Sequence, residues 1–293
     1  MHWTFEPIDL DRQKSYMERL AVCPQKTSDY SFVNLWAWAE EYGLRWAWEQ
    51  GQVWIRQTNP QPQLWAPVGS WTGIDWRQVR RQFGGGPLWL VRVPEKMLGL
   101  WSDGRNGVHI EEARGQWDYL YPIEDLVALD GKRFHKKKNL FNQFVKKYDC
   151  EYVALDDGFI QQALSMQDDW CTWRDCESSE MLAAENRAIA RVLGRWEHLV
   201  GIRGGGLRVG HKMVAYTVAE PLSENTLLVH FEKGNPEYKG VYQAINQMFL
   251  AHADKTFRIV NREQDLDDEG LRKAKLSYHP VAYERKYRVM LPS

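Results

Sequence analysis

The stretch from residue 226 to residue 263 most constrains the fold, because it predicts a strand, a helix and a second strand in direct succession. Residues 226–232 alternate apolar and more polar side chains, which is the period of a strand. Residues 240–252 repeat apolar side chains at helical spacing, and residues 257–263 form the second strand. Two strands joined by a crossover helix should be parallel, so their carboxyl ends should meet at one edge of a sheet.

A similar order of elements occurs twice along the 293 residues. Each pass has helices first, then a hairpin, then a strand, a helix and another strand. The first helix pair includes residues 31–42, with Asp29 or Ser31 as its cap. We therefore expect an α/β (α+β) protein with mixed sheets flanked by helices. Two halves are predicted, residues 1–157 and residues 158–293, with the candidate active site in the second.

Composition indicates a globular protein without a strong general affinity for nucleic acid. Hydrophobic residues make up 44% and charged residues 26% of the chain, and the net charge is −1. The first ten residues lack the apolar core of a signal peptide, and no apolar run approaches the roughly 20 residues that span a bilayer. A cytoplasmic protein without an integral membrane segment is predicted.

Cysteine, histidine and glycine spacings match no metal or nucleotide motif. The four cysteines have no CxxC pair, so reduced thiols are expected at Cys23, Cys150, Cys171 and Cys176. The histidines show no ligand spacing, so no metal site is expected. The runs Gly84–Gly86 and Gly204–Gly206 are not followed by the Lys-Ser/Thr of a phosphate-binding loop, and both are interpreted as turns.

Ionisable side chains gather where the strands of the 226–263 unit end. His230 and Glu232 share one face of the first strand. The second strand and the helix after it supply further polar candidates for substrate binding: Asn261, Arg262, Glu263, Asp265, Arg272, Lys275 and Ser277. Ligands of open α/β sheets bind at such a strand edge. Glu263 and Asp265 could bind the ammonium group of an amino acid, or Arg262 or Arg272 could pair with them in an internal ion network.

A basic segment provides candidate anion contacts. Lys136, Lys137 and Lys138 precede an amphipathic helix, and they are either phosphate contacts, as to a tRNA backbone, or a solvated helix start. Lys239 and Gly240 open the crossover helix, whose free N–H groups favour phosphate or an oxyanion.

Five segments resemble an uncharacterised bacterial family that is similar to the C-terminal domain of phosphatidylglycerol lysyltransferases: residues 32–38, 135–139, 232–234, 261–266 and 269–280. The resemblance covers nearly the whole chain. It implies a tandem pair of GCN5-related N-acetyltransferase-like folds. It also implies kinship with enzymes that move an aminoacyl group from charged tRNA to a small amine or hydroxyl acceptor.

The resemblance suggests roles for individual residues. Acyl transfer needs a base, an oxyanion donor and an acid. Glu232 is the candidate base, with His230 as an alternative. Tyr278 stands where N-acetyltransferase-like folds often carry the acid for the leaving group. A structural hydrogen bond or a packed helix-end aromatic is the competing interpretation of these residues.

Two departures from the related enzymes bear on the substrates. The chain lacks their multi-span membrane domain, which leaves peripheral contact as the expected mode of any membrane association. The loop 239–242 keeps a single glycine, so aminoacyl-tRNA is favoured over acyl-CoA as donor, and no other cofactor is expected. The alternatives are a catalytically inactive amino-acid or peptide binding module and an acyl-CoA-dependent N-acetyltransferase.

Overall fold

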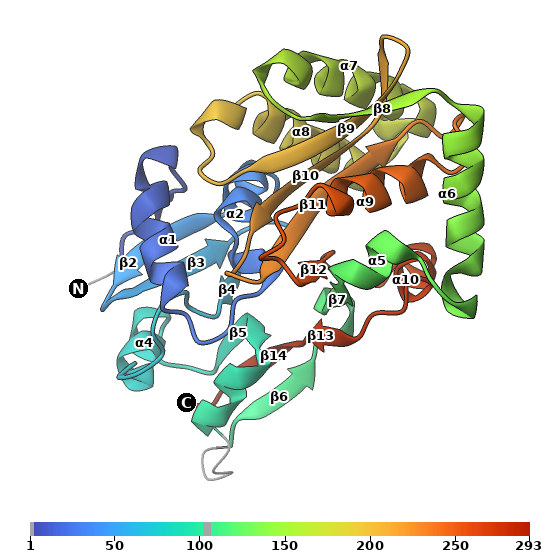
Figure 1. Ribbon diagram of the computed structural model, residues 1–293. Helices are drawn as coiled ribbons and strands as arrows, with labels where there is room; N and C mark the ends of the chain where they lie inside the picture. Colours follow the sequence, from blue (N-terminus) through green and yellow to red (C-terminus); the bar gives the residue numbers. More distant parts are fainter. Residues whose placement is uncertain (1–2, 102–106) are drawn as a thin grey trace. The chain divides into compact units, whose positions relative to one another are not determined.

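The computed structural model describes residues 3–101 and 107–293, which form two compact units (Figure 1). Unit 1 comprises Met1–Asp118, Gln264–Glu269 and Tyr283–Ser293. Unit 2 comprises Tyr119–Glu263 and Gly270–Ala282. The compact units therefore divide the chain after Asp118 and return to unit 1 near its end, whereas the sequence suggested one boundary near residue 157.

Unit 1 is built on a seven-stranded mixed sheet. The strand order is β1-β2-β3-β4-β5-β14-β6, and only β4 and β5 among these neighbours are parallel. The strands are β1 (Glu6–Pro7), β2 (Arg45–Glu49), β3 (Gln52–Gln57), β4 (Gln63–Trp65), β5 (Leu88–Pro94), β6 (His109–Glu112) and β14 (Lys286–Leu291). The helices are α1 (Gln13–Ala21), α2 (Phe32–Ala37), α3 (Ala39–Tyr42) and α4 (Trp76–Gln82).

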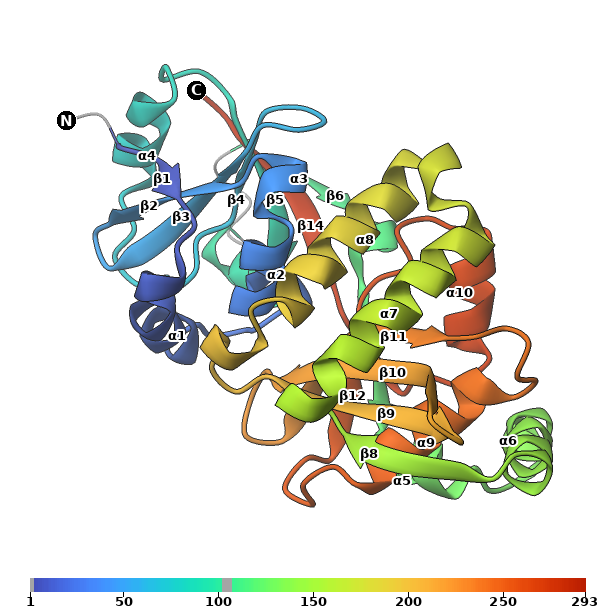
Figure 2. The same ribbon diagram turned by 90° about the horizontal axis from the view of Figure 1, so that it is seen from above.

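The second seven-stranded sheet is built almost entirely from unit 2, in the order β13-β7-β12-β11-β10-β9-β8. The strands are β7 (Asp118–Pro122), β8 (Cys150–Ala154), β9 (Arg203–Val209), β10 (Lys212–Pro221), β11 (Thr226–Gly234), β12 (Ile259–Asn261) and β13 (Ala282–Glu284). The helices are α5 (Ile123–Ala128), α6 (His135–Lys147), α7 (Asp157–Arg174), α8 (Glu180–Leu193), α9 (Val241–Ala251) and α10 (Glu269–Leu276). Helix α7 packs on one face of β10, and α9 covers the other face (Figure 2).

The two sheets have the same strand order with one exchange. When the second sheet is followed from its β8 edge, each sheet starts with five consecutive strands, β1 to β5 and β8 to β12, and the fourth and fifth strands pair in parallel. The sixth position holds β14 in the first sheet and β7 in the second, both antiparallel to the fifth strand. Each sheet therefore takes its sixth strand from the other part of the chain. This exchange explains why the compact units are not two continuous segments.

Local sequence explains the main elements of unit 1. The hairpin of β2 and β3 forms as predicted. Ser31 caps α2 by accepting from the Asn34 backbone N–H at 3.0 Å. Asp29 is not the cap: it is buried in an ion cluster with Arg92 and Lys286. Burial alone would raise the pKa of Asp29, but the two cations outweigh it and hold the pKa below its usual value.

Lys286 on β14 is the centre of this ion cluster. Its side chain is fully buried, and its ammonium lies 2.6 Å from Asp118 and also contacts Asp29. The Ser28 hydroxyl lies 3.3 Å from the same ammonium. The cluster joins the exchanged strand β14 to the amino-terminal part of unit 1, because buried charges remain stable only when they are paired.

The interpretation of Gly204–Gly206 as a turn is wrong, because these glycines lie inside β9. A Cβ atom at Gly204 would meet the Thr217 carbonyl oxygen at 2.7 Å, and one at Gly205 would meet the Tyr152 hydroxyl at 2.5 Å. The glycines are thus required by close packing in the sheet rather than by a reversal of the chain.

The expectation of four reduced cysteines is also wrong. Cys171 and Cys176 form a disulfide, while Cys23 and Cys150 are free. Helix α7 ends at Arg174, and the capping residue Asp175 adopts the left-handed conformation with φ 50°. This reversal brings the two cysteine Cα atoms within 5.1 Å, a normal distance for a disulfide.

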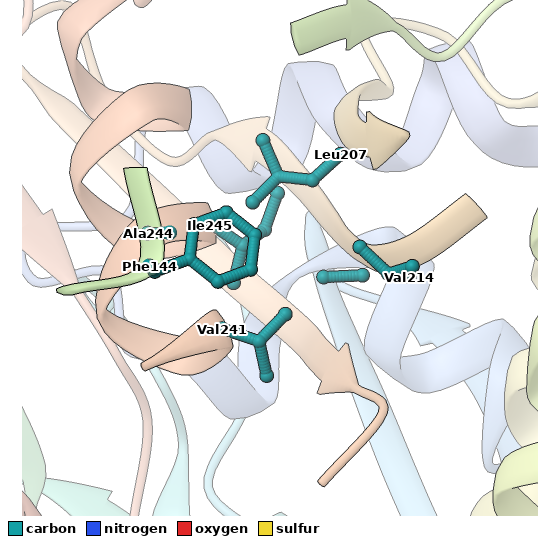
Figure 3. Close-up of a cluster of buried hydrophobic side chains, with 7 residues drawn as sticks. Phe144, Leu207, Val214, Val241, Ala244 and Ile245 are labelled. Carbon is teal, nitrogen blue, oxygen red and sulfur yellow. The ribbon is translucent and has the colours of Figure 1, made fainter. Parts of the chain in front are cut away.

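The core of unit 2 lies between α6, α9 and the sheet. Figure 3 shows side chains from α6, β9, β10 and α9 meeting in one apolar cluster, with Phe144, Leu207, Val214, Val241, Ala244 and Ile245 labelled. The helical spacing of Val241, Ala244 and Ile245 is the pattern that predicted α9. Among the helices that the structure describes, none is long and apolar enough to cross a membrane.

Candidate functional site

The candidate site lies where β11 and β12 separate. Their parallel ladder ends at the pair Leu228 and Asn261, while β11 continues to Gly234. The chain leaves β12 through Glu263, which has a φ of 55°, and the Asn261 side chain accepts from the Glu263 backbone N–H at 2.8 Å. The predicted parallel unit is confirmed, and the residues after Leu228 and Asn261 lie on diverging backbones.

Arg262 is held in this region by two neighbouring side chains. Its Nη2 atom lies 3.0 Å from Glu232 Oε1, and its guanidinium lies 4.8 Å from the centre of the Tyr278 ring. The other oxygen of Glu232 accepts from the Asn246 amide at 3.0 Å. Burial lowers the pKa of Arg262, but the Glu232 carboxylate outweighs it and raises the pKa above its usual value. The guanidinium is therefore a fixed positive charge.

One nitrogen of Arg262 has no hydrogen-bond acceptor. Its Nη1 atom is buried and makes no hydrogen bond to an acceptor among the described residues, although the guanidinium interacts with the Tyr278 hydroxyl. A buried donor without a partner loses its solvation and gains nothing in return. Such a group in a native protein is explained by a bound water, an ion or a ligand.

Two cations lie close to the Tyr278 ring. The Arg262 guanidinium lies 4.8 Å from the ring centre, and the Lys137 ammonium lies 4.1 Å from it. Burial raises the pKa of the Tyr278 hydroxyl, so the hydroxyl stays protonated near neutral pH. Burial and then the charge of Arg262 lower the pKa of Lys137. The sequence grouped Lys137 with phosphate contacts, whereas the structure places it against the candidate acid.

His230 is fully buried between two carboxylates. Its Nδ1 lies 3.1 Å from Glu263, and its Nε2 lies 3.1 Å from Glu220. Burial by itself lowers the pKa of His230, but the two hydrogen bonds outweigh it and raise the pKa to about 9. Both ring nitrogens are engaged and the ring is protonated at neutral pH. This arrangement argues against His230 as a base and makes Glu263 part of an internal ion network.

The remaining predicted residues are dispersed. The Lys275 ammonium donates to the Arg262 carbonyl oxygen, and Ser277 donates to the Ala274 carbonyl oxygen at the end of α10. Arg272 is half-buried on α10. Asp265 belongs to unit 1, where it pairs with Arg114 at 3.2 Å. The structure therefore brings Lys275 close to Arg262, but it assigns Asp265 to a separate ion pair.

The lysine side chains at the start of α6 lie in different environments. Lys136 is exposed, and Lys138 pairs with Asp130 at 2.5 Å. Lys138 also lines a cavity of about 410 Å³ together with Lys132 and His135. A cavity with two lysine side chains at a helix start suits an anion. The expected phosphate contact at Lys136 and Lys138 stays a prediction.

The loop before α9 has a specific packing requirement. Lys239 is exposed, and Gly240 adopts a φ of 91° at the start of α9. A Cβ atom at Gly240 would lie 2.2 Å from the Leu140 carbonyl oxygen of α6. Close packing of two helices therefore accounts for the single glycine, while its predicted contact with phosphate is not tested by this geometry.

A second polar cluster lies on the face of the sheet toward α7. Lys233 forms an ion pair with Glu185 at 2.7 Å, and its ammonium lies 3.9 Å from the ring centre of Trp170. Burial lowers the pKa of Lys233, and the Glu185 carboxylate opposes this. Because Lys233 and Glu232 are adjacent on β11, they point to opposite faces, and Lys233 does not join the Arg262 cluster.

Sequence reasoning missed three polar partners. Asn246 and Gln243 on α9 contact Glu232 and the Tyr278 hydroxyl, at 3.0 and 3.4 Å. Glu220 pairs with His230 from β10. The available signal was the presence of polar residues within otherwise apolar runs: Asn246 is only 2% exposed. Within residues 3–101 and 107–293, no group of three or more His, Cys, Asp or Glu side chains is arranged to hold a metal ion.

The fold is that of an α+β protein with two mixed sheets flanked by helices, as predicted. Residues 20–290 match the family described as phosphatidylglycerol lysyltransferase, C-terminal, and the chain belongs to this family. The family relates the chain to transferases.

Solved structures share this fold. A conserved protein of unknown function from Bacteroides thetaiotaomicron is 30% identical, with a TM-score of 0.88 and 99% of each chain covered. L-PGS from Bacillus licheniformis has the same fold, with a TM-score of 0.67, 12% identity and coverage of 98% of this chain and 93% of that one. An uncharacterised protein from Mycoplasmoides gallisepticum is 22% identical over 210 residues, which span 67% of this chain and 66% of that relative.

Proposed function

We propose that unit 2 transfers an aminoacyl group from charged tRNA to a small amine or hydroxyl acceptor. Membership of the phosphatidylglycerol lysyltransferase C-terminal family supports the reaction class. The observation that carries the proposal is the buried Nη1 of Arg262, which has no acceptor among the described residues. It is a fixed cationic donor at the separating ends of two parallel strands, which suits the carbonyl oxygen of an acyl group.

The remaining residues supply the proton transfers of this proposal. The acceptor attacks the ester carbonyl carbon, and Glu232 takes the acceptor's proton directly or through water. Arg262 stabilises the negative oxygen of the intermediate. The bond to the terminal ribose of tRNA then breaks, and the ribose oxygen takes a proton from Tyr278. Solvent returns the proton from Glu232 to Tyr278.

Electrostatics support these roles for Tyr278 and Lys137. The Tyr278 hydroxyl is protonated because burial raises its pKa, and two neighbouring cations stabilise the tyrosinate that forms after proton donation. The cavity lined by Lys132, His135 and Lys138 lies at the start of the helix that carries Lys137. In this proposal the cavity contacts a phosphate of the tRNA backbone.

The test is a transfer assay with a panel of charged tRNAs and small acceptors. Arg262→Lys keeps a cation beside Glu232 but removes the second guanidinium nitrogen, and we expect transfer to fall by roughly 10²–10³-fold. Arg258→Lys is the matched control, because Arg258 is exposed. Transfer at the wild-type rate by Arg262→Lys would remove this residue as the oxyanion donor.

Tyr278→Phe tests the proposed acid. The phenylalanine ring keeps the packing between Lys137 and Arg262, so we expect the free energy of unfolding to change by less than about 1 kcal/mol, while transfer falls by on the order of 10²-fold. Thermal melting and turnover are measured on the same preparation. An unchanged rate constant would assign Tyr278 a packing role.

An amino-acid or peptide binding module is the second candidate. Two observations favour it: Glu232 is already paired with Arg262, and both ring nitrogens of His230 already contact carboxylates. Calorimetry distinguishes the candidates: saturable binding of a free amino acid or peptide, with no transfer from any charged tRNA, would support the binding module. Tight acetyl-CoA binding would instead support an acyl-CoA-dependent enzyme.

A further inference from the structure

Unit 1 contains a cavity that the proposed transfer reaction does not use. Its volume is about 380 Å³, within the range of small-molecule sites. The cavity lies by β3, β4 and β5, and its lining combines apolar residues with the two arginines Arg56 and Arg288 and the two glutamines Gln61 and Gln63. A pocket of this size with few charged groups suits a small ligand that is largely apolar and carries few charged groups itself.

One part of the wall is apolar and partly accessible to solvent. Leu64, Leu88 and Val91 are buried lining residues, and the rings of Phe83 and Trp89 complete the apolar surface. Trp89 is 36% exposed, which is high for a side chain of this size. The Arg288 guanidinium lies 4.9 Å from the Trp89 ring centre. A ligand in this cavity would therefore cover aromatic surface next to a cation.

The charges of the two arginines are not equally compensated. Arg288 pairs with Glu111 at 3.4 Å. Arg56 is exposed and lies 4.7 Å from the ring centre of Phe5, and no carboxylate of the described residues pairs with it. One guanidinium thus remains available to a ligand. Guanidinium groups bind carboxylates through two parallel hydrogen bonds, which a single alcohol or amine cannot reproduce.

The geometry points to a binding site in unit 1 for a small amphipathic carboxylate. The apolar body of the ligand lies against Leu64, Leu88 and Val91 between the two aromatic rings, and its carboxylate pairs with Arg56. An aliphatic acid and an aromatic acid share this chemistry. The site is independent of the Arg262 cluster, because all of these residues belong to unit 1.

The experiment is isothermal titration of the whole protein with decanoate and, separately, with indole-3-acetate. We expect saturable binding of at least one acid, and the tighter of the two identifies the aliphatic or aromatic class. Decanol and decylamine, which lack the carboxylate, should bind at least tenfold more weakly than decanoate if the aliphatic acid is the ligand. Binding of neither acid, or of decylamine as tightly as the acids, would overturn the proposal.

Two variants locate the binding. Arg56→Gln should weaken binding of the acid at least tenfold, because the paired charge is lost. Arg19→Gln is the matched control: Arg19 is an exposed residue of α1 and does not line the cavity. Trp89→Ala should weaken binding without changing the preference for a carboxylate. Equal affinities for Arg56→Gln and Arg19→Gln, with both proteins folded by circular dichroism, would contradict this location.

Discussion

Single buried charges in this protein are stabilised by their neighbours, and His230 shows the consequence for pH. Its pKa rises from the usual 6.5 to about 9 in the folded state. A raised folded-state pKa stabilises the protein fully below pH 6.5, and this stabilisation is lost as the pH rises through about 9. The shift corresponds to roughly 3 kcal/mol of the free energy of unfolding.

The prediction compares the wild type with His230→Gln. The wild type should lose roughly 3 kcal/mol more stability between pH 6.5 and pH 9 than the variant, which cannot titrate at this position. Urea unfolding at several pH values measures the difference. Parallel stability profiles for the two proteins would show that His230 is not charged in the folded state.

Lys286 carries a second residue-scale prediction. Lys286→Met removes the ammonium that contacts Asp29 and Asp118 but keeps an unbranched side chain of similar length. Because two buried carboxylates are left with less compensation, unfolding should require about 3–5 kcal/mol less free energy. Lys14→Met, at an exposed position of α1, is the control and should change little. Similar denaturation midpoints for both variants would refute the structural role of the cluster.

At the scale of elements, the contact of α6 with the start of α9 depends on one glycine. Gly240→Ala places a methyl group 2.2 Å from the Leu140 carbonyl oxygen and also strains a backbone with φ 91°. We expect a loss of at least about 2 kcal/mol. Gly131→Ala is a matched control, because Gly131 has a φ of 83° but no atom within 4 Å of the added group. Chemical denaturation should show a clearly smaller loss for the control.

The elements that were predicted well are those whose apolar residues recur at a regular spacing. Alternation in β11 and the 3.6-residue spacing in α9 were sufficient for the parallel unit and for placing Glu232 near the residues after β12. The approach of Lys137 to Tyr278 could not be predicted, because helix period indicates which face is buried and not what it contacts. Likewise, the disulfide depends on the left-handed conformation of Asp175, which a spacing of five residues does not specify.

At the scale of the whole molecule, the exchange of β7 and β14 was not predictable from strand patterns. Alternation shows that a strand has a buried face, but β14 would satisfy that requirement in either sheet. The boundary suggested near residue 157 assumed that neighbouring elements stay together. In the structure, β7 pairs with β12 and β14 pairs with β5, across long sequence separations.

A fragment of residues 1–157 tests the importance of this exchange. It lacks β14 and Lys286, so β5 has no partner on one side and β6 has lost the strand with which it pairs. We expect no cooperative thermal transition by circular dichroism. A fragment with the same residues followed by a glycine-serine linker and residues 283–293 should regain cooperativity. Cooperative unfolding of the shorter fragment would show that β14 is dispensable.

The placement of β14 also has a consequence for biosynthesis. The ribosome makes the chain from the amino terminus, so every residue of unit 2 has left the peptidyl-transferase centre before β14 is translated. During that time β5 presents an unpaired edge, and such edges attract other nascent chains. Unit 1 begins to be translated first, yet its sheet is complete only after unit 2 has been made. Until then, the edge of β5 needs protection from pairing with other chains.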